Sequence, residues 1–200
     1  MRILRAIILF IAVFAVSSVA SAASAPVAVV EALHEKLLAT MKEADQLGMD
    51  GRYRTLQPIL EESFDFQRMI AAAAGSYWAQ ASDAERQRLT DAFTKLSITT
   101  YAARFNAWTG ESFETLGERA GPRDSVFVDT RLNRPKDPAV PITYVMTETD
   151  GRWRIVDVLL DKSISELAVR RSEYSQVLRS GGPDKLAEVL DQKAAELRAP

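Results

Sequence analysis

The chain has no cysteine and a single histidine, His34, among its 200 residues. The absence of cysteine excludes disulfide scaffolds, thiolate zinc sites and thiol nucleophiles. A lone histidine leaves little from which to build a catalytic triad or a metal centre. His34 lies on or beside the apolar positions of the first predicted helix, and we interpret it as a residue that either lies at the solvent edge or is held by a hydrogen bond.

The sequence also has no large excess of charge of one sign. Lys and Arg total 25 against 27 Asp and Glu, which gives a net charge of −2. We therefore expect no basic face and no nucleic-acid partner.

The sequence motifs of nucleotide-binding loops and of serine hydrolases are absent as well. The patterns G-x-G-x-x-G, G-x-x-x-x-G-K-[ST] and G-x-S-x-G do not occur. These absences disfavour nucleotide-dependent enzymes and serine hydrolases, and we expect no cofactor and no metal.

The first 22 residues have the three parts of a secretory signal peptide. Arg2 and Arg5 form the positive start, an apolar run covers residues 6–16, and two A-x-A patterns follow. This run is shorter than the roughly 20 apolar residues that span a bilayer. We predict cleavage after Ala22 and export to the periplasm of a mature chain, residues 23–200, that forms a single domain.

Apolar spacing predicts helices on both sides of a strand-rich segment. Apolar residues recur every three or four positions, as they do in amphipathic helices. Asp65 can cap a third helix, and Ser82 with Glu85 forms a capping box that opens a long helix. The predicted helices cover residues 26–47, 52–63, 66–78, 82–110, 163–179 and 184–197.

The middle of the mature chain contains four predicted strands. These runs are rich in Val, Ile, Thr and aromatic residues and are separated by turn residues. Asp150-Gly151 predicts a tight hairpin between the last two strands. The order of helices, strands and helices indicates an α+β fold, with N- and C-terminal helices covering a curved four-stranded antiparallel sheet. The strands are predicted at residues 112–116, 125–132, 141–148 and 152–160.

A curved sheet covered by helices can enclose an apolar cavity. Each aromatic or methionine residue alone is ordinary core, but together they suit a flexible or bulky lipid. We select the lining by helical face and by strand parity, since residues two apart in a strand share a face. The predicted lipid-binding residues are Met69, Tyr77, Trp78, Tyr101, Phe105, Val126, Val128, Thr130, Ile142, Tyr144, Met146, Ile155 and Leu167.

One pair of acidic residues is a candidate for acid–base chemistry. Asp157 and Asp161 lie four residues apart at the end of the last strand, and parity places Asp157 on the same face as Ile155. A buried carboxylate there could act as a general base. Acidic residues near strand ends are more often structural, and we favour an ion pair with Arg170 or Arg171.

Two groups of motifs carry a resemblance to a known family. One is Arg52-Tyr53 followed by Phe64-Asp65-Phe66. The other is Trp153-Arg154-Ile155-Val156-Asp157-Val158, followed by Ile164-Ser165 and Arg171-Ser172-Glu173-Tyr174. In order and spacing they resemble the MlaC-type periplasmic lipid carriers, which are auxiliary components of ABC transporters. The resemblance covers nearly the whole mature chain.

The resemblance implies a fold like that of a nuclear transport factor domain, with lipid tails inserted between sheet and helices. It also implies traffic between an inner-membrane lipid transporter and an outer-membrane acceptor. Most members have a glycine before the [VI]-S pair, whereas residues 161–165 lack it and form a longer turn. That turn, together with residues 101–105, 109–111 and 166–171, is most similar to the hopanoid-associated HpnM branch. The implied ligand is a hopanoid or a phospholipid.

Three hypotheses follow. The first is a soluble, monomeric periplasmic protein, not an enzyme, that shuttles a hopanoid or phospholipid between inner and outer membranes by enclosing its apolar part. The alternative is an isomerase or hydratase of similar fold that acts on a polycyclic lipid, with Asp157 and Tyr101 or Tyr144 as acid and base. The third is an envelope adaptor without a lipid, which the lack of an internal cavity would favour.

Overall fold

The protein has an α+β architecture in which helices precede the strands and one long helix follows them. This computed structural model describes residues 25–161 and 163–199, and the predicted signal peptide, residues 1–22, lies outside them. The helices are α1 (Ala25–Lys42), α2 (Ala44–Ser63), α3 (Phe66–Ala74), α4 (Ser76–Gln80), α5 (Asp83–Arg104) and α6 (Glu166–Glu196). The strands are β1 (Ser112–Ala120), β2 (Val126–Asn133), β3 (Val140–Thr149), β4 (Arg152–Leu160) and β5 (Ile164–Ser165).

The strands form one antiparallel sheet in the order β1-β2-β3-β4-β5. The sequence predicts four strands, and the fifth is a two-residue strand that pairs with the end of β4. β1 runs past its predicted end at residue 116, because a bulge before Gly117 lets it continue pairing with β2. The predicted hairpin between β3 and β4 is present, with positive φ at Asp150 and Gly151.

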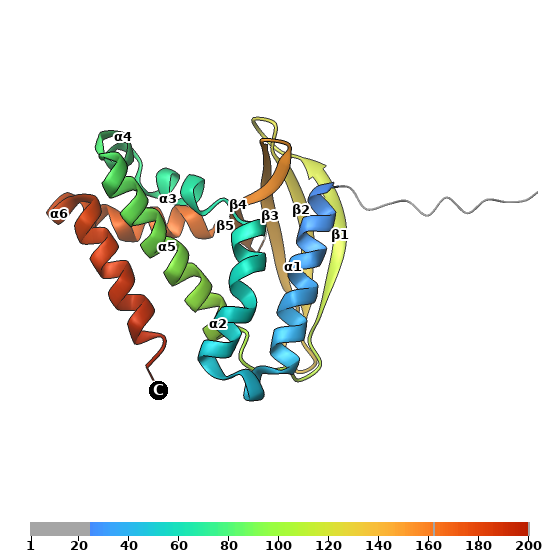
Figure 1. Cartoon of the computed structure of the whole chain (residues 1–200). Helices are drawn as coiled ribbons and strands as arrows, with labels where there is room; N and C mark the ends of the chain where they lie inside the picture. The colour runs from blue at the N-terminus through green and yellow to red at the C-terminus, as the bar shows by residue number, and fades with distance from the viewer. Residues whose placement is uncertain (1–24, 162, 200) are drawn as a thin grey trace, which may run out of the picture.

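The helices are stacked on one side of the sheet (Figure 1). α1 lies against the sheet and contacts β1, β2 and β4, and α2 packs between α1 and α5. α5 and α6 pack on each other farther from the sheet (Figure 1). None of the helices in the described residues has the length and apolarity that a membrane span requires. The central core includes Leu33, Leu37, Leu60, Ile70, Phe93, Val128, Met146 and Ile155.

Capping side chains determine where two of the helices begin, and glycines determine where two helical segments break. The Asp65 carboxylate accepts a hydrogen bond from a backbone amide in the first turn of α3 at 2.9 Å. Ser82 and Glu85 form the predicted capping box of α5. Gly75, with φ of 57°, divides the predicted third helix into α3 and α4. Gly182, with φ of 69°, bends α6 at the predicted boundary between the two C-terminal helices.

Two helix ends differ from the prediction. α1 ends at Lys42 rather than residue 47, and Gly48, with φ of 58°, interrupts α2 instead. α5 ends at Arg104 rather than near Gly110, because Phe105 leaves the helical conformation with ψ of 58°. In both places the apolar spacing continues beyond the helix, so periodicity alone overestimates its length.

The contribution of the inner sheet face to stability can be measured at β4. Ile155 is fully buried, whereas Ile164 in β5 is 49% exposed. We expect Ile155→Ala to lower the free energy of unfolding by about 2–5 kcal/mol, because it removes buried methyl groups and leaves a void. The matched variant Ile164→Ala should change it by less than about 0.5 kcal/mol. Urea denaturation measures both, and equal losses would contradict a core role for Ile155.

Candidate functional site

A cavity of about 630 Å³ lies between the sheet and the helices. The register of the strands explains its sheet wall, because Ile142 stands opposite Leu160 and Tyr144 opposite Val158. Paired residues point to the same face, so these side chains form one continuous surface. The uncharged part of the wall on the helical side consists of Met41, Phe64, Phe66, Met69, Phe93, Ser97, Thr100, Tyr101 and Phe105.

Stacked aromatic rings brace this helical wall. Phe64 stacks on Phe66 with ring centres 5.4 Å apart, and Tyr101 stacks on Phe105 at 5.7 Å. The two pairs meet where Phe64 and Tyr101 pack edge to face at 5.7 Å. Burial raises the pKa of Tyr101, so its phenol keeps its proton. The braced rings therefore hold α5 against the start of α3 and present an uncharged surface.

His34 supports the sheet wall. It is 5% exposed, its Nε2 lies 3.0 Å from the Tyr144 hydroxyl, and its ring stacks on Phe113 with centres 3.9 Å apart. Burial lowers the pKa of His34 to about 4 and raises the pKa of Tyr144 well above its ordinary value. Both groups are therefore neutral near pH 7. The hydrogen bond satisfies the one polar atom of the Tyr144 side chain, which lets this residue line an apolar cavity.

Charged side chains also line the cavity. The Glu111 carboxylate accepts hydrogen bonds from the amide and hydroxyl of Thr109, and these bonds lower its pKa. Arg134 donates two hydrogen bonds to the carbonyl oxygen of Pro138. The charged groups of Glu111 and Arg134 are thus both held by hydrogen bonds within the loops to which they belong. The remaining charged lining residues are Arg104, Glu166 and Arg170.

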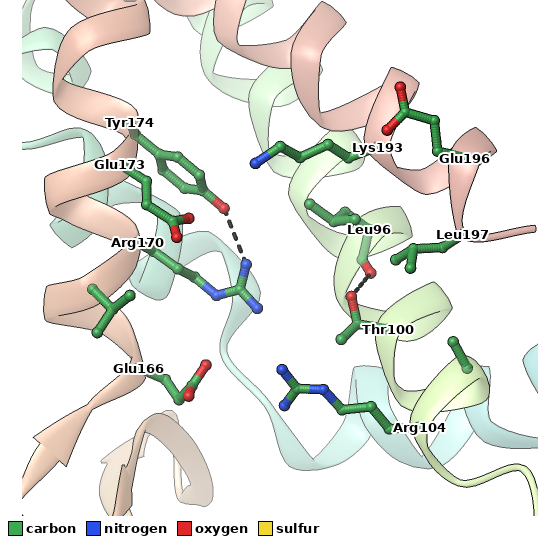
Figure 2. A pocket seen from close by; sticks show the side chains of 12 residues that line it. Leu96, Thr100, Arg104, Glu166, Arg170, Glu173, Tyr174, Lys193, Glu196 and Leu197 are labelled. Carbon is green, nitrogen blue, oxygen red and sulfur yellow. Dashed lines mark hydrogen bonds between the residues drawn. The ribbon is translucent and has the colours of Figure 1, made fainter.

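A second hollow, of about 560 Å³, adjoins the first between α5 and α6 (Figure 2). Arg170 donates a hydrogen bond to the Tyr174 hydroxyl at 3.2 Å, and its guanidinium lies 5.6 Å from the centre of the Phe93 ring. Four side chains line both hollows, and we refer to them as the junction. The junction consists of Thr100, Arg104, Glu166 and Arg170.

The structure separates the predicted lipid-binding residues into two groups. Met69, Tyr101, Phe105, Ile142 and Tyr144 line the cavity. The remainder lie outside it, because the cavity occupies only part of the inner sheet face and α4 lies beyond it. Lipid contact by any of these side chains stays a prediction. The residues outside the cavity lining are Tyr77, Trp78, Val126, Val128, Thr130, Met146, Ile155 and Leu167.

Strand parity holds on β2 and β3. Val126, Val128 and Thr130 stand opposite the predicted β3 residues, so all of them share the inner face. Val128 is nevertheless fully buried, and Thr130 donates its hydroxyl to a β3 carbonyl oxygen at 2.9 Å. The inner face is therefore more extensive than the cavity, and parity alone does not identify its lining.

On β4 the predicted parity is wrong because the strand contains a bulge. Neighbouring β3 residues pair with Ile155 and Asp157, so Val156 between them is an extra residue. Ile155 faces the core, whereas Asp157 lies on the opposite face. The bulge also brings Val158 and Leu160 to the inner face, where they line the cavity.

Asp157 has a structural role at the start of α6. Its carboxylate accepts hydrogen bonds from the Ser165 hydroxyl at 2.6 Å and from the Leu167 amide at 3.1 Å. Ser165 itself caps α6. The predicted ion pair of Asp157 with Arg170 or Arg171 does not occur in the described residues. Asp157 therefore anchors α6 to β4, outside the cavity lining.

Several lining residues were missed by the sequence reasoning. Leu132 and Val140 continue the parity of their strands, and Phe64 and Phe66 belong to a family motif, so signals for these four were present. The charged lining residues could not be predicted from residue type, since arginine and glutamate are ordinary surface residues, although all but Arg134 lie in segments that carry the resemblance to the HpnM branch. The other missed lining residues are Met41, Phe93, Ser97, Thr100, Arg104, Asn106, Ala107, Glu111, Arg134, Val158, Leu160, Glu166 and Arg170.

Together the fold and the cavity define an α+β protein with a preformed, mainly apolar hollow between its sheet and its helices. The MlaC protein family matches residues 31–192, and the chain belongs to this family, as the motifs predict. A search of curated proteins finds no match. Among solved structures, a phospholipid-binding protein from Ralstonia solanacearum, in complex with a phospholipid, is similar to this chain. It is 24% identical with a TM-score of 0.76, covers 88% of this chain and 100% of its own, and confirms the predicted fold class.

Acid should destabilise the protein through His34. The pKa of His34 is about 4 in the folded state and near its ordinary value of 6.5 after unfolding, so the unfolded chain binds the proton first. Stability should therefore be constant with respect to this group above pH 6.5 and fall by up to about 3 kcal/mol towards pH 4. In His34→Gln this part of the pH dependence should disappear. Urea denaturation across the pH range tests it, and an unchanged slope in the variant would exclude His34 as the cause.

Asp157→Asn should weaken the anchor between β4 and α6. The neutral amide is a poorer acceptor for the Ser165 hydroxyl and the Leu167 amide. We expect a loss of about 1–3 kcal/mol in the free energy of unfolding, measured in urea. Ligand retention should be unchanged, because Asp157 is not part of the cavity lining. If the wild-type protein turned over a polycyclic lipid, and the variant bound that lipid without turning it over, the result would support the enzyme hypothesis instead.

Proposed function

We propose that the mature chain, residues 23–200, is a periplasmic carrier that encloses the apolar part of a membrane lipid. The observation that carries this proposal is the cavity of about 630 Å³ between the sheet and the helices, with its aliphatic and aromatic walls. Each methylene group that leaves water for such a cavity contributes about 0.8 kcal/mol. A carrier makes and breaks no bond, so neutral side chains such as Tyr101 and Tyr144 are sufficient for its task.

The comparisons support a carrier. Membership of the MlaC family favours transfer between an inner-membrane lipid transporter and an outer-membrane acceptor. We propose that the protein acts as a monomer. The similar protein from Ralstonia solanacearum binds a phospholipid, which favours a phospholipid ligand here. The long turn at residues 161–165, similar to that of the HpnM branch, favours a hopanoid. We propose that the ligand is one of these two lipid classes.

The occupancy of the cavity can be tested with a tryptophan placed on its sheet wall. Ile142 lines the cavity, and Val145 lies on the opposite face of the same strand. We expect Ile142→Trp to lower lipid affinity about tenfold, because the indole displaces the tail contacts of roughly two methylene groups. Val145→Trp should retain the lipid. Native mass spectrometry of protein from the periplasm of cells containing hopanoids and phospholipids, followed by lipid extraction, measures both.

The wild-type protein should carry lipid in the same experiment. Protein that emerges empty from such cells, and that binds neither lipid class in vitro, would contradict the proposed function. Equal lipid loss in both tryptophan variants would instead show that the tail lies elsewhere than against the inner face of β3.

A further inference from the structure

We propose that Arg104 and Arg170 bind the phosphodiester of a glycerophospholipid whose acyl chains occupy the cavity. This inference rests on the proposed function and deepens it, because it selects one of the two lipid classes. A site built for a phosphate discriminates against a lipid without one, such as an uncharged hopanoid.

The position of the junction points to a phosphate. The larger hollow has mainly aliphatic and aromatic walls, whereas six of the twelve residues that line the smaller hollow, junction included, are charged. A phospholipid has the same order of parts, since the phosphate connects the apolar chains to the polar head substituent. With its chains in the larger hollow and its head substituent in the smaller one, its phosphate lies at the junction.

The two arginines have hydrogen-bond donors to offer there. In the described part of the chain, no hydrogen bond or ion pair engages the Arg104 guanidinium at the end of α5. Arg170 uses one donor on Tyr174 and is held over the Phe93 ring, which leaves further N–H groups of its five. Figure 2 shows both guanidiniums reaching from different helices towards the same hollow. Arginine forks match the oxygens of a phosphate, and such charge-assisted bonds are strong.

Acidic side chains near the arginines determine how tightly an anion is held. Glu166 belongs to the junction, and Glu173 and Glu196 line the smaller hollow together with Lys193. Three cationic and three acidic side chains therefore line this hollow, and its net charge is zero. Such a site exerts little long-range attraction on free anions. The phosphate is retained only when the acyl chains are also bound, and the lipid can leave once they are withdrawn.

The experiment compares lipids with and without the phosphate. Delipidated protein is titrated with a phosphatidylethanolamine, with the diacylglycerol that has the same acyl chains, and with inorganic phosphate, and binding is followed by native mass spectrometry. Arg104→Gln and Arg170→Gln should each weaken phosphatidylethanolamine binding about tenfold, in line with the loss of charge-assisted hydrogen bonds. Binding of the diacylglycerol should change less than about twofold. Inorganic phosphate at equal concentration should not bind.

Arg119→Gln is the matched control. Arg119 also lies over a phenyl ring, that of Phe127, and also makes a polar contact, with Asp129, but it lines neither hollow. Its substitution should leave the binding of both lipids unchanged. Arg170→Lys keeps the positive charge over Phe93 and should recover part of the phospholipid affinity, which separates phosphate binding from loss of folding.

The outcomes distinguish this inference from the proposed function. Arginine variants that lose both lipids equally, or neither lipid, would overturn the phosphate site while leaving the carrier function in place. Binding of inorganic phosphate as tight as that of the phospholipid would also overturn it, because the site would then be an anion site independent of lipid. A wild-type protein that binds a hopanoid but neither of these lipids would overturn the phosphate site alone. Failure to bind a hopanoid as well would overturn the proposed function itself.

Discussion

An apolar hollow of this size persists in water only where solid packing on every side holds its walls apart. Protein interiors are close-packed, and a void forfeits the contacts that would otherwise stabilise its lining. Here the packing is supplied from two directions. α1 and α2 fill the space over one part of the inner sheet face with Leu33, Leu37 and Leu60, and α3, α5 and α6 pack on one another behind the helical wall. The rings of Phe64 and Tyr101, which pack edge to face, join these two packed regions across the cavity wall.

The same packing determines the electrostatics of the cavity. His34, Tyr101 and Tyr144 are polar yet uncharged near neutral pH, and burial shifts the pKa of each further from neutrality, downward for His34 and upward for the two tyrosines. The hydrogen bond between His34 and Tyr144 completes the pairing of polar atoms behind the sheet wall. Charge appears only among the more exposed lining residues, where local hydrogen bonds hold Glu111 and Arg134. The apolar walls and the charged junction thus differ in how deeply their side chains are buried.

The difference between local and tertiary interactions explains how much of the molecule can be predicted from its sequence. Local chemistry is sufficient for the Asp65 cap, the Ser82 capping box and the hairpin at Gly151, because neighbouring residues determine them. The α+β order and the inner face of β2 and β3 follow from periodicity. The bulge at Val156 does not, since nothing in a run of apolar residues shows which one is left unpaired. The extent of the cavity depends on which part of the sheet α1 and α2 cover, which is a tertiary property.

That bulge connects the wall of the cavity to the junction. With one extra residue in β4, Val158 turns inward to meet the cavity and Asp157 turns outward. From the outer face, the Asp157 carboxylate holds Ser165 and the first turn of α6. Arg170 lies one turn further along that helix, at the junction with the second hollow. A regular strand would place Asp157 inside and leave α6 without its anchor, so one inserted residue makes an uncharged cavity and a positioned arginine compatible in the same fold.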